Sequence, residues 1–339
     1  MLKRLLAAVL SVGILAMGLA GCGSNAADTA SSSSSGSAAK EMPAPKIAFC
    51  TWVGYGPLFI AKEKGYFEKY GVNPELVIMD DESQFANAVA SNSVQGLAHV
   101  IDREVINASQ DVPENVVLVL DQSYGGDGII ASGDIASMAD LKGRTVGLDK
   151  STTSYFFFLS ALAKNNMTES DINIQNMPAA DAGAAFVAGK LDAAVVWEPW
   201  LTNASQREGG HVLLNSKDLP NTIVDTLTLR SDFIKENPDA VKGIVAAWYD
   251  AVEFYKQNPD EGNKIMAKYL NIDEKDIADM VKGIQYYDKD ANTKLFDKNE
   301  TDNIYSVADR AAKFWLDDKM IEKAPNMDEF ISKDFYKGN

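Results

Sequence analysis

The stretch from Val116 to Ala131 constrains the fold of this chain more than any other. A short apolar run, 116–120, is rich in β-branched residues and ends abruptly at Asp121, as fully buried strands do. A polar, Gly-rich turn follows, and a second apolar run begins at Ile129. Because open α/β sheets bind ligands at the carboxyl ends of such strands, we expect a ligand beside this turn. A solvated turn rich in Asp and Gly is the alternative for this stretch alone.

The segments around that stretch alternate between strand and helix patterns. Apolar runs at residues 46–51, 75–79 and 96–100 are separated by helical patterns. Strands that alternate with helices at this spacing predict the α/β class, with a mostly parallel sheet flanked by helices. A second unit of the same kind, about a hundred residues long, follows residue 131. Beyond residue 230 the apolar spacing is helical to the end of the chain.

The first 22 residues have the three parts of an export signal. Lys3 and Arg4 form a basic start, residues 5–19 are apolar, and small residues then lead to Cys22. A run this short is typical of a signal peptide rather than a membrane span. It resembles a bacterial lipoprotein signal, which implies cleavage before Cys22 and an extracytoplasmic protein, lipid-anchored through that thiol to the bacterial cell membrane. An ordinary secretory signal with an incidental cysteine is the alternative.

Composition excludes several function classes. The Ser-, Ala- and Gly-rich segment 22–45 buries too little apolar surface to fold, so we interpret it as a flexible tether. The net charge of −16 argues against nucleic acid as a partner and weakly favours cationic ligands. Two histidines are too few for a His-rich zinc or copper site, and we expect neither a metal nor a cofactor. Once Cys22 is acylated, Cys50 has no disulfide partner.

Three stretches resemble the substrate-binding proteins of nitrate/sulfonate/taurine-type ABC importers. They are TWVGYGPLFIAKEKGYFEKYGV at residues 51–72, DLKGRTVGLDKSTTSYFFFLSAL at 140–162 and AAFVAGKLDAAVVWEPW at 184–200. The resemblance spans nearly the whole chain after the tether and implies a two-lobe periplasmic-binding-protein-like fold of type II. It also implies a monomer that holds one small solute between its lobes and delivers it to a membrane permease with an ATPase.

The resemblance further implies where the lobes begin and end, with a first lobe built from two separate parts of the chain. The expected boundaries are 1–21 for the signal peptide, 22–45 for the tether, 46–131 for the first part of lobe 1, 132–223 for lobe 2, and 224–339 for the return crossing and the second, helical part of lobe 1.

Acidic residues stand where several expected strands end: Glu82, Asp102, Asp121, Asp127 and Glu198. The sulfonate and nitrate branches of the resembled family instead need donors and positive charge around an anion. Several converging buried carboxylates imply a cationic partner, and each aromatic face adds about 0.5–2 kcal/mol of cation–π attraction. We therefore expect a small nitrogen compound that is guanidine-like, an amine or choline-like. An anion or zwitterion such as alkylsulfonate, taurine or nitrate is the alternative.

The candidate ligand-binding residues come from both lobes and from the crossing segments, and none is expected to be catalytic. They are aromatic, acidic or hydroxyl-bearing side chains near expected strand ends or helix starts. The set is Trp52, Tyr55, Glu82, Asp102, Asp121, Tyr124, Asp127, Ser151, Thr152, Thr153, Trp197, Glu198 and Asp225.

Each of these candidates has a purely structural alternative. The aromatic side chains can pack the edge of a lobe, and the acids can cap turns or brace the crossing segments. Glu198 can pair with Arg144 or Lys150, and Asp102 can cap the helix that follows it. A carboxylate such as that of Glu82 is favourable in the first turn of a helix without any ligand.

The hydroxyls of Ser151, Thr152 and Thr153 stand at an expected helix start. Backbone N–H groups at such a start can hold an anion. A zwitterion would place its anionic group there and its amine against the acids. A helix cap without a ligand is the alternative.

Two other function classes stay open. An enzyme on the same fold, related to pyrimidine-synthesising proteins, needs a His and a Cys cluster that we do not find in this sequence. A surface adhesin or a partner of a sensor is the other class. We expect a binding protein without catalysis, which closes around its solute by hinge motion at the crossing segments.

Overall fold

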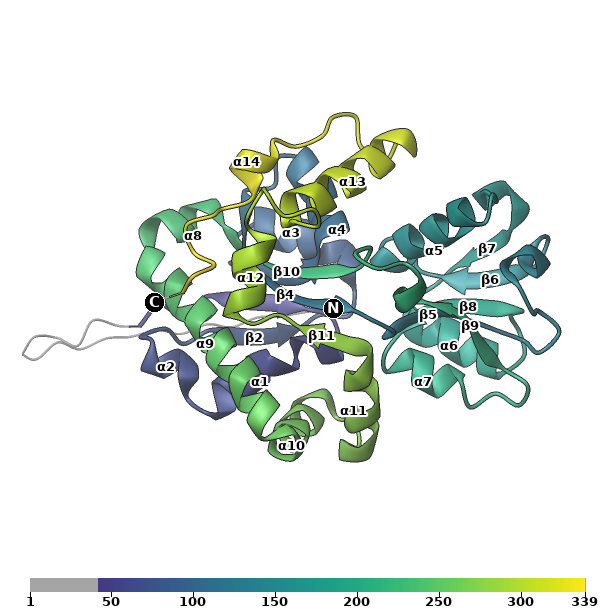
Figure 1. Ribbon diagram of the computed structural model, residues 1–339, viewed down its shortest axis with the longest axis horizontal. Helices are drawn as coiled ribbons and strands as arrows, with labels where there is room; N and C mark the ends of the chain where they lie inside the picture. The colour runs from purple at the N-terminus through teal and green to yellow at the C-terminus, as the bar shows by residue number, and fades with distance from the viewer. Residues whose placement is uncertain (1–41, 339) are drawn as a thin grey trace, which may run out of the picture. The chain divides into compact units, whose positions relative to one another are not determined.

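The computed structural model describes residues 42–338, which carry two β-sheets with helices packed against them (Figure 1). The expected signal peptide, Cys22 and the tether up to residue 41 lie outside the described residues, so their roles stay predictions. In the part of the chain that is described, no helix combines the length and apolar character needed to cross a membrane.

Six strands form the first sheet, in the order β11-β4-β10-β3-β1-β2. Strand β1 runs parallel to β2 and β3, whereas β10 is antiparallel to β3 and β4, and β11 is antiparallel to β4. The inner strands β3 and β10 are buried along their whole length, as expected for strands covered on both faces. The strands are Lys46–Phe49 (β1), Glu75–Ile78 (β2), Gly96–Val100 (β3), Glu114–Ser123 (β4), Val224–Arg230 (β10) and Ile284–Tyr286 (β11).

Five strands form the second sheet, in the order β7-β6-β8-β5-β9. Strand β6 runs parallel to β7 and β8, and β5 is antiparallel to β8 and β9. The strands are Asp127–Ala131 (β5), Thr145–Leu148 (β6), Asn173–Asn176 (β7), Ala193–Trp197 (β8) and His211–Asn215 (β9). Two α/β lobes are thus present, as the sequence predicts. The sheets are mixed and not mostly parallel as expected, because β10 and β11 in the first sheet and β5 and β9 in the second pair antiparallel.

Strand β5 differs from the expected lobe boundary. It hydrogen-bonds to β8 and β9, so the chain leaves the first lobe at residues 124–126 and not after residue 131. The apolar run could not reveal this, because a buried strand has the same pattern in either sheet. The return to the first sheet comes at Val224, where β10 begins.

Helices connect the strands and form most of the chain after residue 230. The α-helices are Gly56–Glu63 (α1), Tyr66–Lys69 (α2), Phe85–Ala90 (α3), Ile101–Ser109 (α4), Thr153–Lys164 (α5), Ala179–Val187 (α6), Trp200–Ala204 (α7), Ser231–Glu236 (α8), Pro238–Gln257 (α9), Pro259–Leu270 (α10), Glu274–Met280 (α11), Lys289–Leu295 (α12), Ile304–Asp317 (α13) and Met327–Phe330 (α14). The short 3-10 helices are Val53–Tyr55 (η1), Glu82–Gln84 (η2), Met138–Leu141 (η3), Glu169–Asp171 (η4), Ser216–Asp218 (η5) and Val281–Gly283 (η6).

Helices α9 and α13 each bury a tryptophan that hydrogen-bonds to the backbone of another segment of the chain. Trp248 of α9 is fully buried in the core of the first lobe, and its Nε1 donates to the carbonyl of Tyr287 at 3.0 Å. Trp315 of α13 is equally buried, and its Nε1 donates to the carbonyl of Asp102 at 3.1 Å. The Trp315 ring also lies 5.5 Å from that of Phe156 in α5, so α13 contacts the second lobe as well.

Two short crossing segments, residues 124–126 and 216–223, join the lobes. The hydroxyls of Ser123 and Ser216 lie 2.8 Å apart, and the backbone N–H of Gly125 donates to Ser216 Oγ at 2.6 Å. Gly125 has a φ of +116°, a conformation that residues with a Cβ rarely adopt. The two crossings are therefore tied to each other beside the first sheet.

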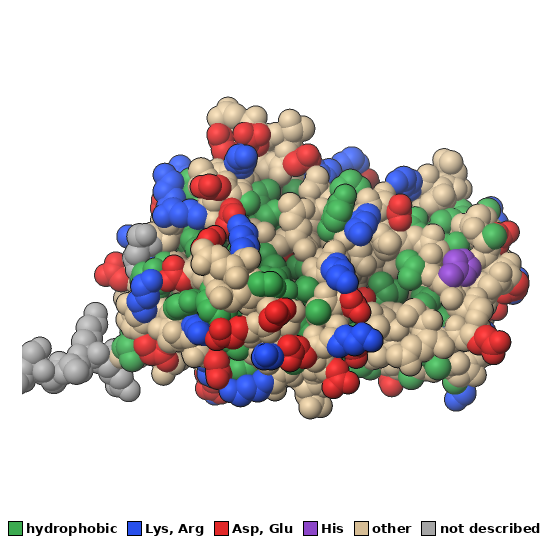
Figure 2. Space-filling view, turned by 60° about the horizontal axis from the view of Figure 1, so that its bottom comes forward, with side chains coloured by type: hydrophobic (Ala, Val, Ile, Leu, Met, Phe, Trp, Pro, Cys, Tyr) green, Lys and Arg blue, Asp and Glu red, His purple; other side chains and the backbone are tan. Residues whose placement is uncertain are grey.

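Charged side chains of both signs are interspersed on the face shown in Figure 2. Exposed ion pairs such as Lys69–Asp250 and Lys268–Glu63 occur on the surface of the first lobe. Pairs of this kind contribute only about 0–1 kcal/mol each. Several buried acids, in contrast, lie at or beside a cavity between the lobes.

Candidate ligand-binding site

A cavity lies between the two lobes. It encloses about 310 Å³, including the part that opens to solvent. Its lining comes from strand ends, helix starts and the return crossing: Cys50, Trp52, Tyr55, Glu82, His99, Val100, Asp127, Thr153, Trp197, Ile223 and Asp225.

Seven of the thirteen sequence candidates line this cavity. Both lobes and the return crossing contribute, although these residues are far apart in the chain. The seven are Trp52, Tyr55, Glu82, Asp127, Thr153, Trp197 and Asp225. Their shared location is a structural observation, and ligand binding by them remains a prediction.

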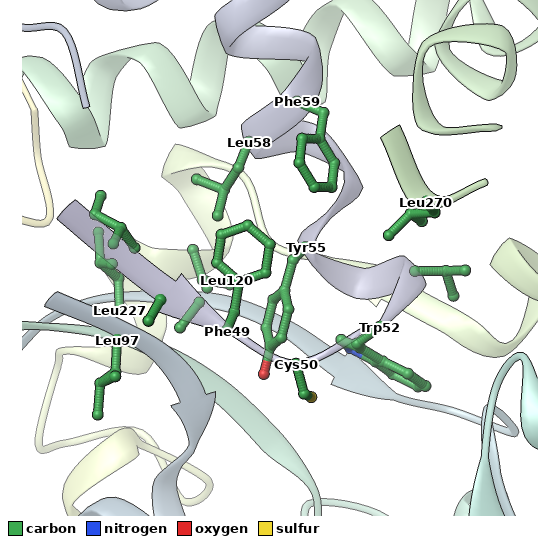
Figure 3. Close-up of a cluster of buried hydrophobic side chains, with 14 of the residues drawn as sticks. Phe49, Cys50, Trp52, Tyr55, Leu58, Phe59, Leu97, Leu120, Leu227 and Leu270 are labelled. Atoms are coloured by element: carbon green, nitrogen blue, oxygen red, sulfur yellow. The ribbon is translucent and has the colours of Figure 1, made fainter. Parts of the chain in front are cut away.

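Aromatic side chains form one part of the cavity wall. Tyr55 ends η1, and its hydroxyl donates to Asp225 Oδ1 at 2.5 Å. Figure 3 shows this hydroxyl pointing away from the apolar core side chains of α1. Trp197 ends β8 of the second lobe, and its Nε1 donates to the backbone carbonyl of Thr51 in the first lobe at 3.1 Å. Together with Trp52, these rings leave flat apolar faces beside the acids.

Two carboxyl groups in the wall are held at raised pKa values. Burial is the main cause that raises the pKa of Asp127 to about 8, with the nearby charge of Asp225 adding to it. Burial also raises the pKa of Asp225 to about 7, although the hydrogen bond from Tyr55 opposes this. Each group is therefore unfavourable as an anion in the present surroundings, and a positive charge in the cavity would relieve that cost.

His99 is the basic side chain of the cavity. Its Nε2 lies 3.1 Å from Glu82 Oε2, and its Nδ1 lies 2.8 Å from Glu104 Oε1. Burial acts to lower the pKa of His99, but the two carboxylates outweigh it and raise that pKa to about 10. His99 is thus a buried cation that already balances Glu82, whose pKa it lowers against the effect of burial. Asp127 and Asp225 have no such partner.

Asp102 and Asp121 lie behind the wall, and neither lines the cavity. Asp121 Oδ1 accepts from Trp52 Nε1 at 3.3 Å, and Asp102 Oδ1 accepts from Thr153 Oγ1 at 2.8 Å. Both side chains are fully buried, and burial raises the pKa of Asp102 to about 6 and that of Asp121 well above its ordinary value. They support the wall residues Trp52 and Thr153 from behind.

Of the three hydroxyl groups expected to hold an anion, one lines the cavity and two do not. Helix α5 begins at Thr153 as predicted, and Thr152 is its N-cap, accepting from the N–H of Ser154. The Ser151 hydroxyl donates to the carboxylate of Asp149 at 2.6 Å. Only Thr153 lines the cavity, because the other two hydroxyls serve the turn that starts the helix.

Two further candidates, Tyr124 and Glu198, do not line the cavity. Tyr124 is 45% exposed on the first crossing, where Lys217 Nζ lies 5.5 Å from its ring centre. Glu198 is buried, but it accepts from the N–H and the hydroxyl of Thr202 at 3.0 and 2.9 Å, instead of pairing with a base. Its carboxylate therefore stabilises the start of α7, a role that the residue type alone does not distinguish from ligand binding.

Sequence reasoning missed four wall residues. They are Cys50, His99, Val100 and Ile223. Cys50 follows the last residue of β1, and Val100 ends β3, so the rule that ligands lie at strand ends could have found both. His99 and Ile223 carried no local signal, because their partners come from distant parts of the chain.

The lining can balance positive charge and accept hydrogen bonds. None of the residues that line the cavity in the described part of the chain is Lys or Arg. Three carboxyl groups face one imidazolium, and two of the three have no cationic partner there. No group of three or more His, Cys, Asp or Glu side chains among residues 42–338 is arranged to hold a metal ion.

Two α/β lobes around one small cavity define the class of periplasmic solute-binding folds, and solved structures agree. The periplasmic aliphatic sulphonate binding protein SsuA from Escherichia coli superposes with a TM-score of 0.73 at 19% identity, over 87% of this chain and 99% of that one. The desulfurization enzyme DSZB has a TM-score of 0.64 at 14% identity, over 86% and 97%. The fold is therefore shared by binding proteins and at least one enzyme.

The model of the NMT1-like family matches residues 38–271, and the chain belongs to that family. A putative aliphatic sulfonates-binding protein of Bacillus subtilis is 24% identical, over 94% of this chain and 92% of its own. The taurine-binding periplasmic protein of Escherichia coli is 26% identical, over 68% and 74%. The predicted membership among the nitrate/sulfonate/taurine-type binding proteins of ABC importers is confirmed at this level.

Proposed function

We propose that this protein captures a small solute bearing a cationic nitrogen group, guanidine-like or a small amine, in the cavity between its lobes. One observation carries the proposal: Asp127 and Asp225 are buried in the wall without a cationic partner, and the lining has no Lys or Arg. Unpaired buried carboxylates are costly, so a cation with N–H donors would stabilise them by charge and by hydrogen bonds.

A zwitterion or anion, such as taurine, an alkylsulfonate or nitrate, is the second candidate. The names of the relatives favour it more directly than they favour a cation, because they specify sulfonates and taurine. The N-terminus of α5 adds support, since Thr153 brings that helix start to the cavity wall. Taurine fits both sets of observations, with its amine toward the acids and its sulfonate toward α5.

Delivery of the captured solute to a membrane permease and its ATPase completes the proposed role. The protein would act outside the cytoplasm, held to the membrane by a lipid on Cys22. We expect metabolic labelling of cells with a fatty acid to label the protein at Cys22. The Cys22→Ser variant should not be labelled. A protein that stays water-soluble in cells with Cys22 intact would contradict the anchor.

A thermal-shift screen of the full chain tests the choice of solute. Guanidinium, methylammonium, taurine, methanesulfonate and nitrate are compared in phosphate buffer, because sulfonate and amine buffers would themselves compete. A true ligand at a hundred times its Kd adds about 2.7 kcal/mol to the free energy of unfolding. We expect guanidinium or methylammonium to raise the melting temperature. If only methanesulfonate and nitrate raise it, the cation proposal is wrong; if taurine alone does, the zwitterion is favoured.

A further inference from the structure

We propose that Asp121 and Asp225 share one proton in the solute-free protein and release it when a cationic solute enters the cavity. The inference rests on the proposed function, because it concerns the same cavity. It assigns a role to Asp121, which does not line the cavity. Asp121 would set the charge of the site by acting through Asp225.

The two carboxyl groups face each other across two paired strands. Asp121 on β4 and Asp225 on β10 are directly opposite in the antiparallel register. They are 0% and 1% exposed, and their carboxyl groups are within hydrogen-bonding reach. Like charges directly opposite each other in a sheet are destabilising, and two buried carboxylates cannot both ionise at low cost. One proton between them removes this conflict.

The free oxygen atoms point to the same conclusion. Asp121 Oδ1 accepts from Trp52, and Asp225 Oδ1 accepts from Tyr55. The second oxygen of each, Oδ2, is buried and has no hydrogen-bond donor among the described residues. A carboxylate oxygen buried in this way costs free energy unless a proton or a donor reaches it. The shared proton supplies that donor before the solute arrives.

The surroundings provide little competing positive charge. Tyr286, which ends β11, and Tyr287, which follows it, approach Asp121. Both hydroxyls have raised pKa values chiefly because of burial, so they stay neutral. Burial likewise raises the pKa of the Tyr55 hydroxyl. The remaining titratable groups near the pair face it from the cavity side and from α4: Cys50, Glu82, His99, Asp102 and Asp127. His99 is the cation of this group, and two glutamates already hold it.

The exchange balances in atoms and charge. The O–H bond of the protonated carboxyl breaks, and the proton passes to water and then to the bulk solution. The pair gains one negative charge, and the entering cation brings one positive charge, so the net charge of the cavity is unchanged. Binding of a cation then becomes tighter as pH rises, by up to about tenfold per pH unit while the pair is still protonated. An anion would produce no release of protons, or an uptake.

Proton release can be measured directly on the full chain. The protein is mixed with guanidinium chloride or methylammonium chloride at millimolar concentration in weakly buffered NaCl at pH 6, and a pH-stat records the protons released. Calorimetry on the same solutions gives the amount of cation bound. We expect at least one proton per bound cation at pH 6, because Asp127 adds to the proton from the pair, and a value that falls toward zero as pH rises. Binding without proton release would overturn the inference and leave the proposed function standing, whereas no binding would overturn both.

Variants separate the pair from other buried acids. Asp121→Asn removes one acid of the pair and leaves the cavity lining intact, so we expect the proton count to fall by about one and affinity for guanidinium to fall at least tenfold. Glu114→Gln is the control, because Glu114 forms a second buried acid pair with Glu104 and does not itself line the cavity. It should leave the proton count unchanged. An equal loss in both variants contradicts the assignment, and if Asp121→Asn does not fold, the wild-type proton count still decides.

Discussion

Asp127 lines the cavity between the lobes, and none of the lining residues among those described is a Lys or Arg that could pair with it. Its backbone N–H donates to Ser123 Oγ at 3.1 Å, and its side chain lines the cavity without a basic partner. Trp197 pairs with Asp127 across the two strands, and Glu198 is the next residue in the chain. The Glu198 carboxylate, however, accepts two hydrogen bonds from Thr202. Two acids with the same sequence signal thus have different roles.

Substitution of each acid by its amide tests that difference. Asp127→Asn removes a charged hydrogen-bond acceptor from the cavity, so we expect a loss of about 1.5–3 kcal/mol, or roughly ten- to a hundredfold in Kd for guanidinium. Glu198→Gln keeps one acceptor for Thr202 and should change Kd less than twofold, with a stability change of about 1 kcal/mol or less. Calorimetric titration of both variants is the measurement. Equal losses of affinity in the two variants would indicate that Glu198 also binds the solute.

At the scale of elements, the first crossing is held by a contact between glycines. The carbonyl of Gly283 accepts from the N–H groups of Tyr124 and Gly126 at 2.8 and 3.1 Å. A Cβ on Gly283 would lie 2.7 Å from the backbone nitrogen of Gly126, too close for any real contact. The segment η6 therefore contacts the crossing directly, and any hinge motion between the lobes must pivot against it.

Gly283→Ala is expected to push η6 away from the crossing. The backbone must move to admit the Cβ, which costs about 1–3 kcal/mol of unfolding free energy and weakens both hydrogen bonds to the crossing. Gly183→Ala in α6 is the control, because its Cβ would meet nothing closer than 3.5 Å. There the gain in helix propensity predicts a stability increase of about 0.4–1 kcal/mol. Denaturant unfolding measures both variants, and a harmless Gly283→Ala would show that the contact is loose.

At the scale of the whole molecule, the buried acids govern the pH dependence of stability. The folded state raises the pKa of Asp127 to about 8 and that of Asp225 to about 7, so between the ordinary pKa near 4 and these values the folded state holds protons that the unfolded state has lost. Stability therefore falls as pH rises through this window. His99 acts in the same direction above its ordinary pKa of about 6.5, since its stabilising charge is lost as pH rises through about 10.

We therefore expect the unfolding free energy of the solute-free protein to fall by about a few kcal/mol between pH 5 and pH 9. Asp127→Asn should flatten the fall, because it removes a group that titrates in this range. Saturating guanidinium should flatten it as well, by stabilising the charged form. Thermal unfolding at a series of pH values is the measurement. A stability that rises from pH 5 to pH 8 would contradict the inferred charge state of the cavity.

The sequence by itself determined the alternation of strands and helices, the two α/β lobes and the family, because apolar periodicity and local motifs are properties of contiguous residues. It also located the strand ends and helix starts from which Trp52, Asp127 and Thr153 reach the cavity. Only the tertiary structure decided the sheet that β5 joins, the pairing of His99 with Glu82 and Glu104, and the opposition of Asp121 and Asp225. Those features depend on contacts between residues far apart in the chain, and a side chain's role is set by the partner that it meets there.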